Sequence, residues 1–122
     1  MSASQYYYKE KVPDLEKRKE ESANIRLKYP DKIPIICERH KESKLPVNER
    51  SKFLAPADLT AMQFSYIIRK RIKVPETESM FFFVNKKILL GGTMMSEVYE
   101  RSKDQDGFLY VIYASENVYG GQ

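Results

Sequence analysis

The chain has 122 residues, 42% of them hydrophobic, and a formal net charge of +4. This length suits one compact domain with one hydrophobic core. No run approaches the roughly 18 apolar residues that a membrane span needs, and the N-terminal "MSASQYYYKEK" lacks the apolar core of a secretory signal. We therefore expect a cytosolic or nuclear protein. Its 21 basic and 17 acidic residues are interspersed, which permits nucleic-acid binding without requiring it.

Two helices are predicted in the first third of the chain, at about residues 5–11 and 14–28. The residues spaced to share one face of the second helix are Leu15, Ser22, Ile25 and Tyr29. Pro13 is placed to start this helix, and Pro30 ends it. The surrounding charges indicate solvated faces.

A strand hairpin follows the helices. "KIPIICER" (32–39) is a short apolar run rich in β-branched residues, and "KFLAP" (52–56) is a second strand after a polar loop. The strongest helical pattern comes next, in "DLTAMQFSYIIRKRI" (58–72), where Thr60 and Gln63 are placed as the N-cap and N3 residues of a capping box.

Three further elements are predicted: an apolar strand "MFFFVNKKILL" (80–90) with a turn at Asn85, a short helix "TMMSEVYERSK" (93–103) capped by Thr93, and a last strand "FLYVIYA" (108–114). This order predicts an α+β fold of the β-grasp type, with one mixed sheet wrapped over a helix. The long parallel crossover places the last strand beside the first, so residues 52–56 form a sheet edge. Open backbone groups at such an edge can pair with a foreign strand.

The sequence contains no recognisable catalytic or metal-binding constellation. The only histidine, His40, follows the first strand without an acid partner, which predicts a solvated loop residue. The only cysteine, Cys37, lies in an apolar run, which predicts a packing role. One histidine and one cysteine do not supply a zinc shell. We expect no enzymatic activity, no metal and no cofactor.

The densest basic cluster, "RKRIK" at residues 69–73, ends the central predicted helix. Cations there favour the negative end of the helix dipole, and a partner site is an equally open reading. No aromatic residue is interleaved to stack bases, so we expect no nucleic-acid partner.

Four blocks carry a resemblance to a known family: "EKRKEESANIRLKYPDKIPIICE", "KFLAPADLTAMQFSYIIRKRI", "FFFVN" and "SEVYERSKDQDGFLYVIYASENVYG". In content, order and spacing they resemble the autophagy-related ubiquitin-like modifiers that include GABARAP and the microtubule-associated protein light chains. The likeness covers nearly the whole chain. It implies a ubiquitin-like β-grasp core with two additional N-terminal helices. The expected division is a helical extension packed on the core (1–30), the core (31–113) and a flexible conjugation tail (114–122).

The resemblance also implies a use for the C-terminal "VYGGQ". In this family a dedicated cysteine protease trims the chain after a glycine that follows an aromatic residue. Activating and conjugating enzymes then join the exposed carboxylate to phosphatidylethanolamine on autophagosomal membranes. By resemblance this glycine is Gly120, which follows Tyr119. Cleavage after Gly121 stays open, because a doubled glycine also fits a generic ubiquitin-like end.

An adaptor role is implied as well, in which aromatic-x-x-aliphatic peptides of cargo receptors add a strand to the sheet edge. The aromatic pocket would comprise Glu21, Ile25, Pro34, Ile36, Lys52, Leu54 and Phe108. The aliphatic pocket would comprise Phe53, Ala55, Pro56, Leu59, Phe64 and Ile67. A basic rim of Lys32, Arg50, Lys52 and Arg71 would attract acidic flanking residues. Ile36, Phe64 and Ile67 also lie on core-type faces, so they either line the pockets or only support them.

The main alternative is an adaptor that is never lipidated. It would bind tubulin or trafficking receptors through its basic N-terminal helices. A protein used only in that way needs no Gly120.

Overall fold

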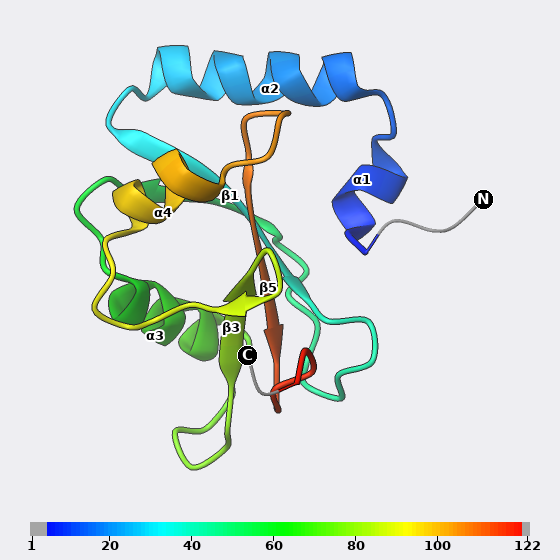
Figure 1. Cartoon of the computed structure of the whole chain (residues 1–122), viewed down its shortest axis with the longest axis vertical. Helices are drawn as coiled ribbons and strands as arrows, with labels where there is room; N and C mark the ends of the chain where they lie inside the picture. Colours follow the sequence, from blue (N-terminus) through cyan, green and yellow to red (C-terminus); the bar gives the residue numbers. More distant parts are fainter. Residues whose placement is uncertain (1–4, 121–122) are drawn as a thin grey trace.

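The computed structural model describes residues 5–120 (Figure 1). Its elements are α1 (Tyr7–Lys11), α2 (Leu15–Lys28), β1 (Lys32–Arg39), β2 (Lys52–Pro56), α3 (Ala61–Arg71), β3 (Phe81–Val84), β4 (Lys87–Ile88), α4 (Met95–Ser102) and β5 (Leu109–Ala114). The predicted order of elements is confirmed. The apolar run at 80–90 is divided into β3 and β4 by a tight turn, in which Asn85 and Lys86 have positive φ angles of 51° and 68°.

The five strands form one mixed sheet in the order β2-β1-β5-β3-β4. β5 pairs with β1 in parallel, and the other pairings are antiparallel. The predicted parallel crossover is therefore confirmed, and so is the place of β2 at the sheet edge. In the described part of the chain, β2 pairs with β1 alone.

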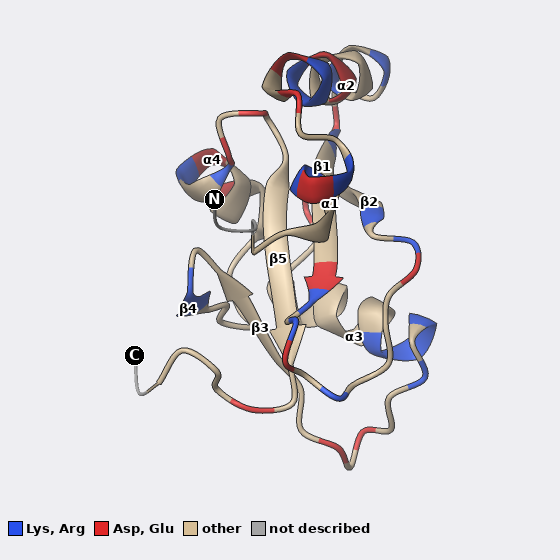
Figure 2. Ribbon diagram, turned by 90° about the vertical axis from the view of Figure 1, so that its right-hand side faces the viewer, with Lys and Arg blue, Asp and Glu red and all other residues tan. Residues whose placement is uncertain are grey.

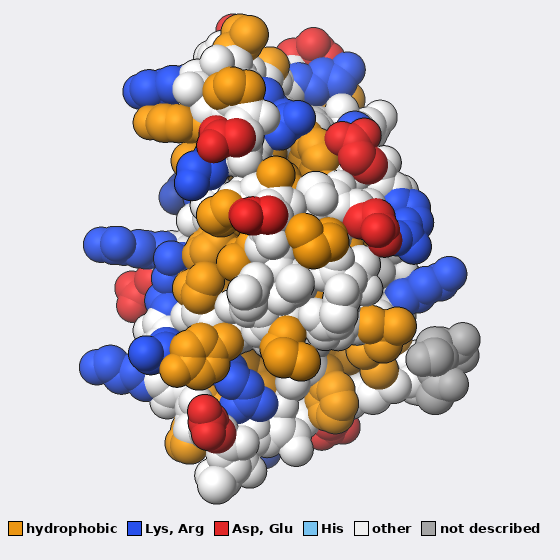
Figure 3. Space-filling view, turned by 90° about the vertical axis from the view of Figure 1, so that its left-hand side faces the viewer, with side chains coloured by type: hydrophobic (Ala, Val, Ile, Leu, Met, Phe, Trp, Pro, Cys, Tyr) orange, Lys and Arg blue, Asp and Glu red, His pale blue; other side chains and the backbone are white. Residues whose placement is uncertain are grey.

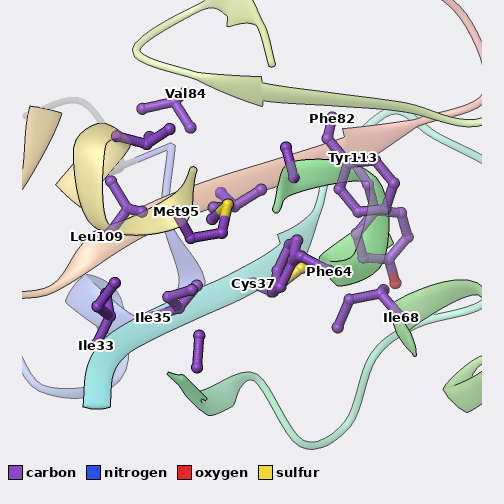
Figure 4. Close-up of a cluster of buried hydrophobic side chains, with 14 of the residues drawn as sticks. Ile33, Ile35, Cys37, Phe64, Ile68, Phe82, Val84, Met95, Leu109 and Tyr113 are labelled. Carbon is purple, nitrogen blue, oxygen red and sulfur yellow. The ribbon is translucent and has the colours of Figure 1, made fainter. Parts of the chain in front are cut away.

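The two faces of the sheet are covered by different helices, because side chains alternate along each strand. Ile33, Ile35 and Cys37 of β1 join the larger core with residues of α3 and α4, as Figure 4 shows. Ile36, on the opposite face, joins a smaller cluster with Phe108 and with tyrosines 6 and 8 from the N-terminal segment. Helix α2 crosses the molecule above this sheet (Figure 1).

Side-chain caps start α2 and α3, and two predictions about helix starts are corrected. The Thr60–Gln63 capping box of α3 is confirmed. Asp14 caps α2 by accepting a hydrogen bond from the Glu16 amide, so Pro13 precedes the cap and does not open the helix. Thr93 does not cap α4: the N-cap residue is Met94, without a side-chain cap.

The prediction for Thr93 was wrong because this segment is tied to α3. The Thr93 carbonyl accepts a hydrogen bond from the Ala61 amide at 2.8 Å, and Met94 forms an antiparallel bridge with Thr60. These pairings set where α4 begins.

Among the residues that the structure describes, no helix is long and apolar enough to cross a membrane.

Candidate functional site

Edge strand β2 presents its side chains alternately to the two faces of the sheet. Phe53 meets Phe64 of α3 edge to face, with ring centres 5.3 Å apart. Lys52 extends toward α2, where its ammonium pairs with the Glu21 carboxylate. Leu54, two residues after Lys52, is 38% exposed. The strand therefore separates Lys52 and Leu54 of the predicted aromatic pocket from Phe53 and Ala55 of the predicted aliphatic pocket, as strand alternation requires.

The structure brings the predicted aromatic-pocket residues together on the α2 face. Ile25 packs against the cluster that contains Ile36 and Phe108, and Pro34 is opposite Leu54 in the strand register. Ile36 and Phe108 are 0% and 1% exposed. These two side chains form the floor, while half-buried Glu21 and exposed Lys52 and Leu54 remain accessible.

Tyr8 of α1 lies in the middle of this pocket, and sequence reasoning missed it. Its hydroxyl donates to Glu21, its ring meets the Phe108 ring at 5.5 Å, and the Lys52 ammonium lies 5.2 Å from the ring centre. Burial and the hydrogen bond to Glu21 raise the pKa of Tyr8, so the hydroxyl stays a donor at neutral pH. A helix of five residues has too short a pattern to reveal its inner face.

Helix α1 is held in place by a buried carboxylate. Glu38 of β1 is 4% exposed and accepts hydrogen bonds from the Tyr7 amide at 2.9 Å and the Tyr8 amide at 2.7 Å. Burial raises the pKa of Glu38, and the two amide bonds partly oppose this effect. Glu38 thus satisfies two orphan amides at the start of the helix and positions Tyr8.

The predicted aliphatic-pocket residues gather on the opposite face, around α3. Ala55 and Phe64 are fully buried and belong to the larger core. Phe53 and Leu59 are partly buried and pack against that core. Pro56 and Ile67 are half-buried. The partly exposed residues on this face are therefore Phe53, Leu59 and Ile67, and Phe64 packs against Phe53.

The four predicted rim cations divide between the two ends of β2. The Arg71 guanidinium donates to the Arg50 carbonyl at 3.2 Å and lies over the Phe53 ring at 5.0 Å. Lys52 is at this same end, whereas Lys32 is opposite Pro56 at the other end. The predicted rim cations therefore lie at both ends of β2.

A groove with a volume of about 810 Å³ opens between α1 and the chain that leads into β2. It shares Glu21, Lys52 and Tyr8 with the aromatic pocket. It continues past the first residue of β2 to Val47 and Arg50. The sequence does not predict this groove, because its walls come from segments about 40 residues apart.

The C-terminal segment folds back onto the core at Tyr119. The Tyr119 ring meets the Phe83 ring at 4.9 Å and the His40 ring at 5.6 Å, both edge to face. The Gly120 amide donates to the Asn117 carbonyl at 3.3 Å, and Gly120 is exposed with a φ of +81°. Gly121, the alternative cleavage site, lies outside the described residues.

The remaining candidates for chemistry have structural roles. Cys37 is fully buried, and burial raises the pKa of its thiol, so the nucleophilic thiolate is disfavoured. His40 is half-buried, and its Nδ1 accepts from the Glu42 amide at 3.2 Å. No group of three or more metal-ligating side chains occurs within residues 5–120.

Comparisons with known proteins agree with this architecture. Residues 17–120 match the family described as "Autophagy protein Atg8 ubiquitin like". Autophagy-related protein 8e of Arabidopsis thaliana is 50% identical over 107 residues, which are 88% of this chain and 88% of that protein. Autophagy-related protein 8 of Mycosarcoma maydis is 49% identical over 105 residues, covering 86% and 89%.

A solved structure is also similar. The crystal structure of Trypanosoma brucei ATG8 superposes with a TM-score of 0.84 at 36% sequence identity, covering 94% of this chain and 97% of that one. Both the sequence blocks and the sheet topology thus agree with one assignment. The chain belongs to the Atg8 family of ubiquitin-like autophagy proteins.

Proposed function

We propose that this protein is a membrane-conjugated autophagy modifier, joined through the Gly120 carboxylate to phosphatidylethanolamine. Gly120 is exposed, and a Cβ placed on it would meet no atom within 4 Å, so the residue is open to an approaching enzyme. Conjugation would give a soluble domain two acyl chains, which suffice for stable membrane residence. The protein would be cytoplasmic before conjugation and on autophagosomal membranes after it.

The conjugating chemistry is assigned to partner enzymes: a processing cysteine protease and the activating and conjugating enzymes of the autophagy system. The chain itself would act as substrate and adaptor and not as an enzyme. Supporting this, its one thiol is buried and its one histidine is packed against Tyr119.

The anchored protein would recruit cargo receptors by adding their aromatic-x-x-aliphatic peptides to β2. One observation carries this proposal: within residues 5–120 the outer side of β2 pairs with no strand, and its alternate side chains reach two separate sites, one under α2 and one over α3. Main-chain pairing would supply affinity, and the two sites would supply specificity.

Nucleic acid is not a proposed partner, since the cations of the basic cluster have intramolecular roles. Arg69 donates to the carbonyls of Pro75 and Glu78, Lys70 lies over the Tyr66 ring, and Arg71 lies over Phe53. On the face shown in Figure 3, basic side chains stand mainly along the borders and hydrophobic ones are interspersed between them. This distribution differs from the basic stripe of a nucleic-acid surface.

Intact-mass analysis of the protein recovered from membranes tests the proposal. The expected species ends at Gly120 and carries phosphatidylethanolamine. A membrane-bound population of unmodified mass would favour the adaptor that is never lipidated.

A further inference from the structure

We propose that the C-terminal segment switches between a docked and a released state, and that the docked state withholds Gly120 from the enzymes that act on it. In the docked state the Tyr119 ring lies against Phe83 and His40. In the released state the segment is extended. This inference rests on the proposed processing at Gly120, but the docked state can be tested without any processing enzyme.

The strand register shows that the chain turns back after β5. Ile112 of β5 is opposite Phe83 of β3. Tyr119 comes seven residues after Ile112, so an extended chain would place it about 23 Å further along the strand direction. The Tyr119 and Phe83 ring centres are instead 4.9 Å apart. The segment therefore returns toward β3, and Figure 2 shows the chain turning aside where β5 ends.

Tyr119 covers Phe83 on the sheet face opposite α3 and α4. Because side chains alternate along β3, Phe82 joins the larger core and Phe83 points to the other face. The smaller cluster on that face contains residues of β1 and β5 but not Phe83. Phe83 is nevertheless only 1% exposed. Release of the segment would return part of this side chain to water, which favours the docked state.

His40 forms the second contact, and its position is set by hydrogen bonds outside the tail. The His40 amide donates to the Tyr113 carbonyl at 2.8 Å, and the His40 carbonyl accepts from the Ser43 amide at 3.0 Å. Its Nδ1 accepts from the Glu42 amide at 3.2 Å. The oriented ring then meets the Tyr119 ring edge to face at 5.6 Å. Phe83 and His40 thus make a site for one aromatic side chain.

A turn completes the docked state and bends the chain at Gly120. The Asn117 Oδ1 accepts from the Tyr119 amide at 3.3 Å, and the Asn117 carbonyl accepts from the Gly120 amide at 3.3 Å. Asparagine side chains stabilise turns by bonding the backbone two residues on. Gly120 has a φ of +81°, so it is exposed but not extended. An enzyme that draws the Gly120 carboxylate into a narrow channel needs the released state.

The docked state acts on enzyme binding and not on the chemical step. Two ring contacts and one turn favour docking, and the conformational entropy of residues 115–120 opposes it. When only the released fraction of a substrate binds, its apparent affinity falls in proportion to that fraction. A change that weakens docking should therefore lower the KM for trimming and leave kcat unchanged.

Limited proteolysis with chymotrypsin tests the docked state. Chymotrypsin cleaves after aromatic residues, and its rate follows the population of the open form when opening and closing are fast. Cleavage after Tyr119 removes residues 120–122, which intact mass detects. His40→Ala and Phe83→Leu should each raise this rate roughly 2- to 12-fold, the range for loss of one aromatic pair. Glu42→Ala, at an exposed position in the same loop, should leave it unchanged.

Trimming by the family's processing protease tests whether docking withholds Gly120. The same two variants should lower KM by a similar factor, whereas Glu42→Ala should not. Tyr119 is kept in all of them, because the protease would contact it directly. Thermal denaturation followed by circular dichroism distinguishes release of the tail from a general loss of stability. If Phe83→Leu lowers the melting temperature, His40→Ala, at a half-buried loop position, decides.

The outcomes separate the inference from the proposed function. Equal chymotrypsin rates for the wild type and His40→Ala would show that these rings do not hold the tail, and the proposal would be wrong. A faster chymotrypsin rate with an unchanged KM for trimming would also overturn it, because docking would not withhold Gly120. If the protease trims none of the chains, the proposed processing fails and the withholding fails with it, while chymotrypsin still decides whether the tail docks.

Discussion

The Arg18 guanidinium on α2 donates a hydrogen bond to the Asp106 carboxylate before β5 at 2.9 Å, and both side chains are buried. Asp106 also accepts from the Tyr110 hydroxyl at 2.6 Å and the Phe108 amide at 2.9 Å. Arg18 donates in addition to the Val12 carbonyl at 2.7 Å. Arg18 therefore anchors α2 to the core through its ion pair with Asp106, and it also holds the segment between α1 and α2 through its hydrogen bond to Val12.

Arg18→Met should lower the free energy of unfolding by about 3–5 kcal/mol, the usual cost of leaving one buried charge without its partner. Urea denaturation measures it. Asp106→Asn in the same chain should cost less than the sum of the two single changes. Lys19, the residue after Arg18, makes an exposed ion pair with Glu16. Lys19→Met should therefore have little effect on the free energy of unfolding. A loss for Arg18→Met as small as that for Lys19→Met would contradict the anchoring role.

Gly107 makes a second close contact between the same segments. Its φ is +91°, and a Cβ placed on it would lie 2.3 Å from the Ser22 hydroxyl oxygen. Gly107→Ala should therefore destabilise the protein by more than the roughly 1–3 kcal/mol of backbone strain alone. Gly92→Ala is the matched control, because a Cβ there would meet no atom within 4 Å. Equal melting temperatures for the two variants would show that α2 can move away without cost.

The sequence predicts what is encoded locally. The Thr60–Gln63 capping box involves residues three apart, and the apolar run of β1 is contiguous, so the sequence predicts both. The two-sided candidate site was reached through the family resemblance. Tyr8 among the pocket residues, the groove and the Arg18–Asp106 pair depend on contacts between distant segments, which periodicity does not report. The predicted helix cap at Thr93 was wrong for the same reason, since the Thr93 carbonyl accepts a hydrogen bond from the Ala61 amide.

Glu38 should make stability depend on pH in a defined direction. A carboxyl whose pKa is higher in the folded chain than in the unfolded chain binds its proton more readily when folded. Its favourable contribution is full below the unfolded pKa, ordinarily near 4.5, and is lost as the pH rises through the raised folded pKa. The stability of the wild type relative to Glu38→Gln should thus fall as the pH rises from about 4 toward neutrality.

Denaturation of both proteins at matched pH values gives this difference directly, because the other titrating groups are common to both. A difference that stays flat or grows with pH would mean that the two amide bonds outweigh burial. The folded pKa of Glu38 would then lie at or below its ordinary value.

Lys52→Ala combined with Leu54→Ala should weaken an aromatic-x-x-aliphatic peptide by roughly 1–3 kcal/mol while leaving the fold intact. Both side chains are exposed on edge strand β2. Lys87→Ala with Leu90→Ala makes the same changes at exposed positions at the opposite edge, and should leave affinity unchanged. Calorimetry compares them. Unchanged affinity in the β2 variant would move the binding surface elsewhere.

Gly120→Ala should abolish both trimming and lipidation. Only a glycine carboxylate freed of downstream residues can be adenylated in a narrow channel and passed to an amine, and a methyl group would obstruct that channel. Within the described residues, a Cβ at position 120 would meet no atom within 4 Å, but the φ of +81° is strained for alanine. Circular dichroism of the variant should therefore show a retained fold before the loss is attributed to processing. A chain that ends at Gly120 should bypass the protease. Mass spectrometry of the membrane fraction should find phosphatidylethanolamine on Gly120.

Gly121→Ala provides the matched control for this experiment, because the residue after the cut is discarded. It should be trimmed and lipidated like the wild type. A lipidated species that keeps Gly121, or a block by Gly121→Ala but not by Gly120→Ala, would shift the conjugation site by one residue. If neither change alters membrane association in cells, attachment does not pass through this tail, and the adaptor that is never lipidated becomes the better account.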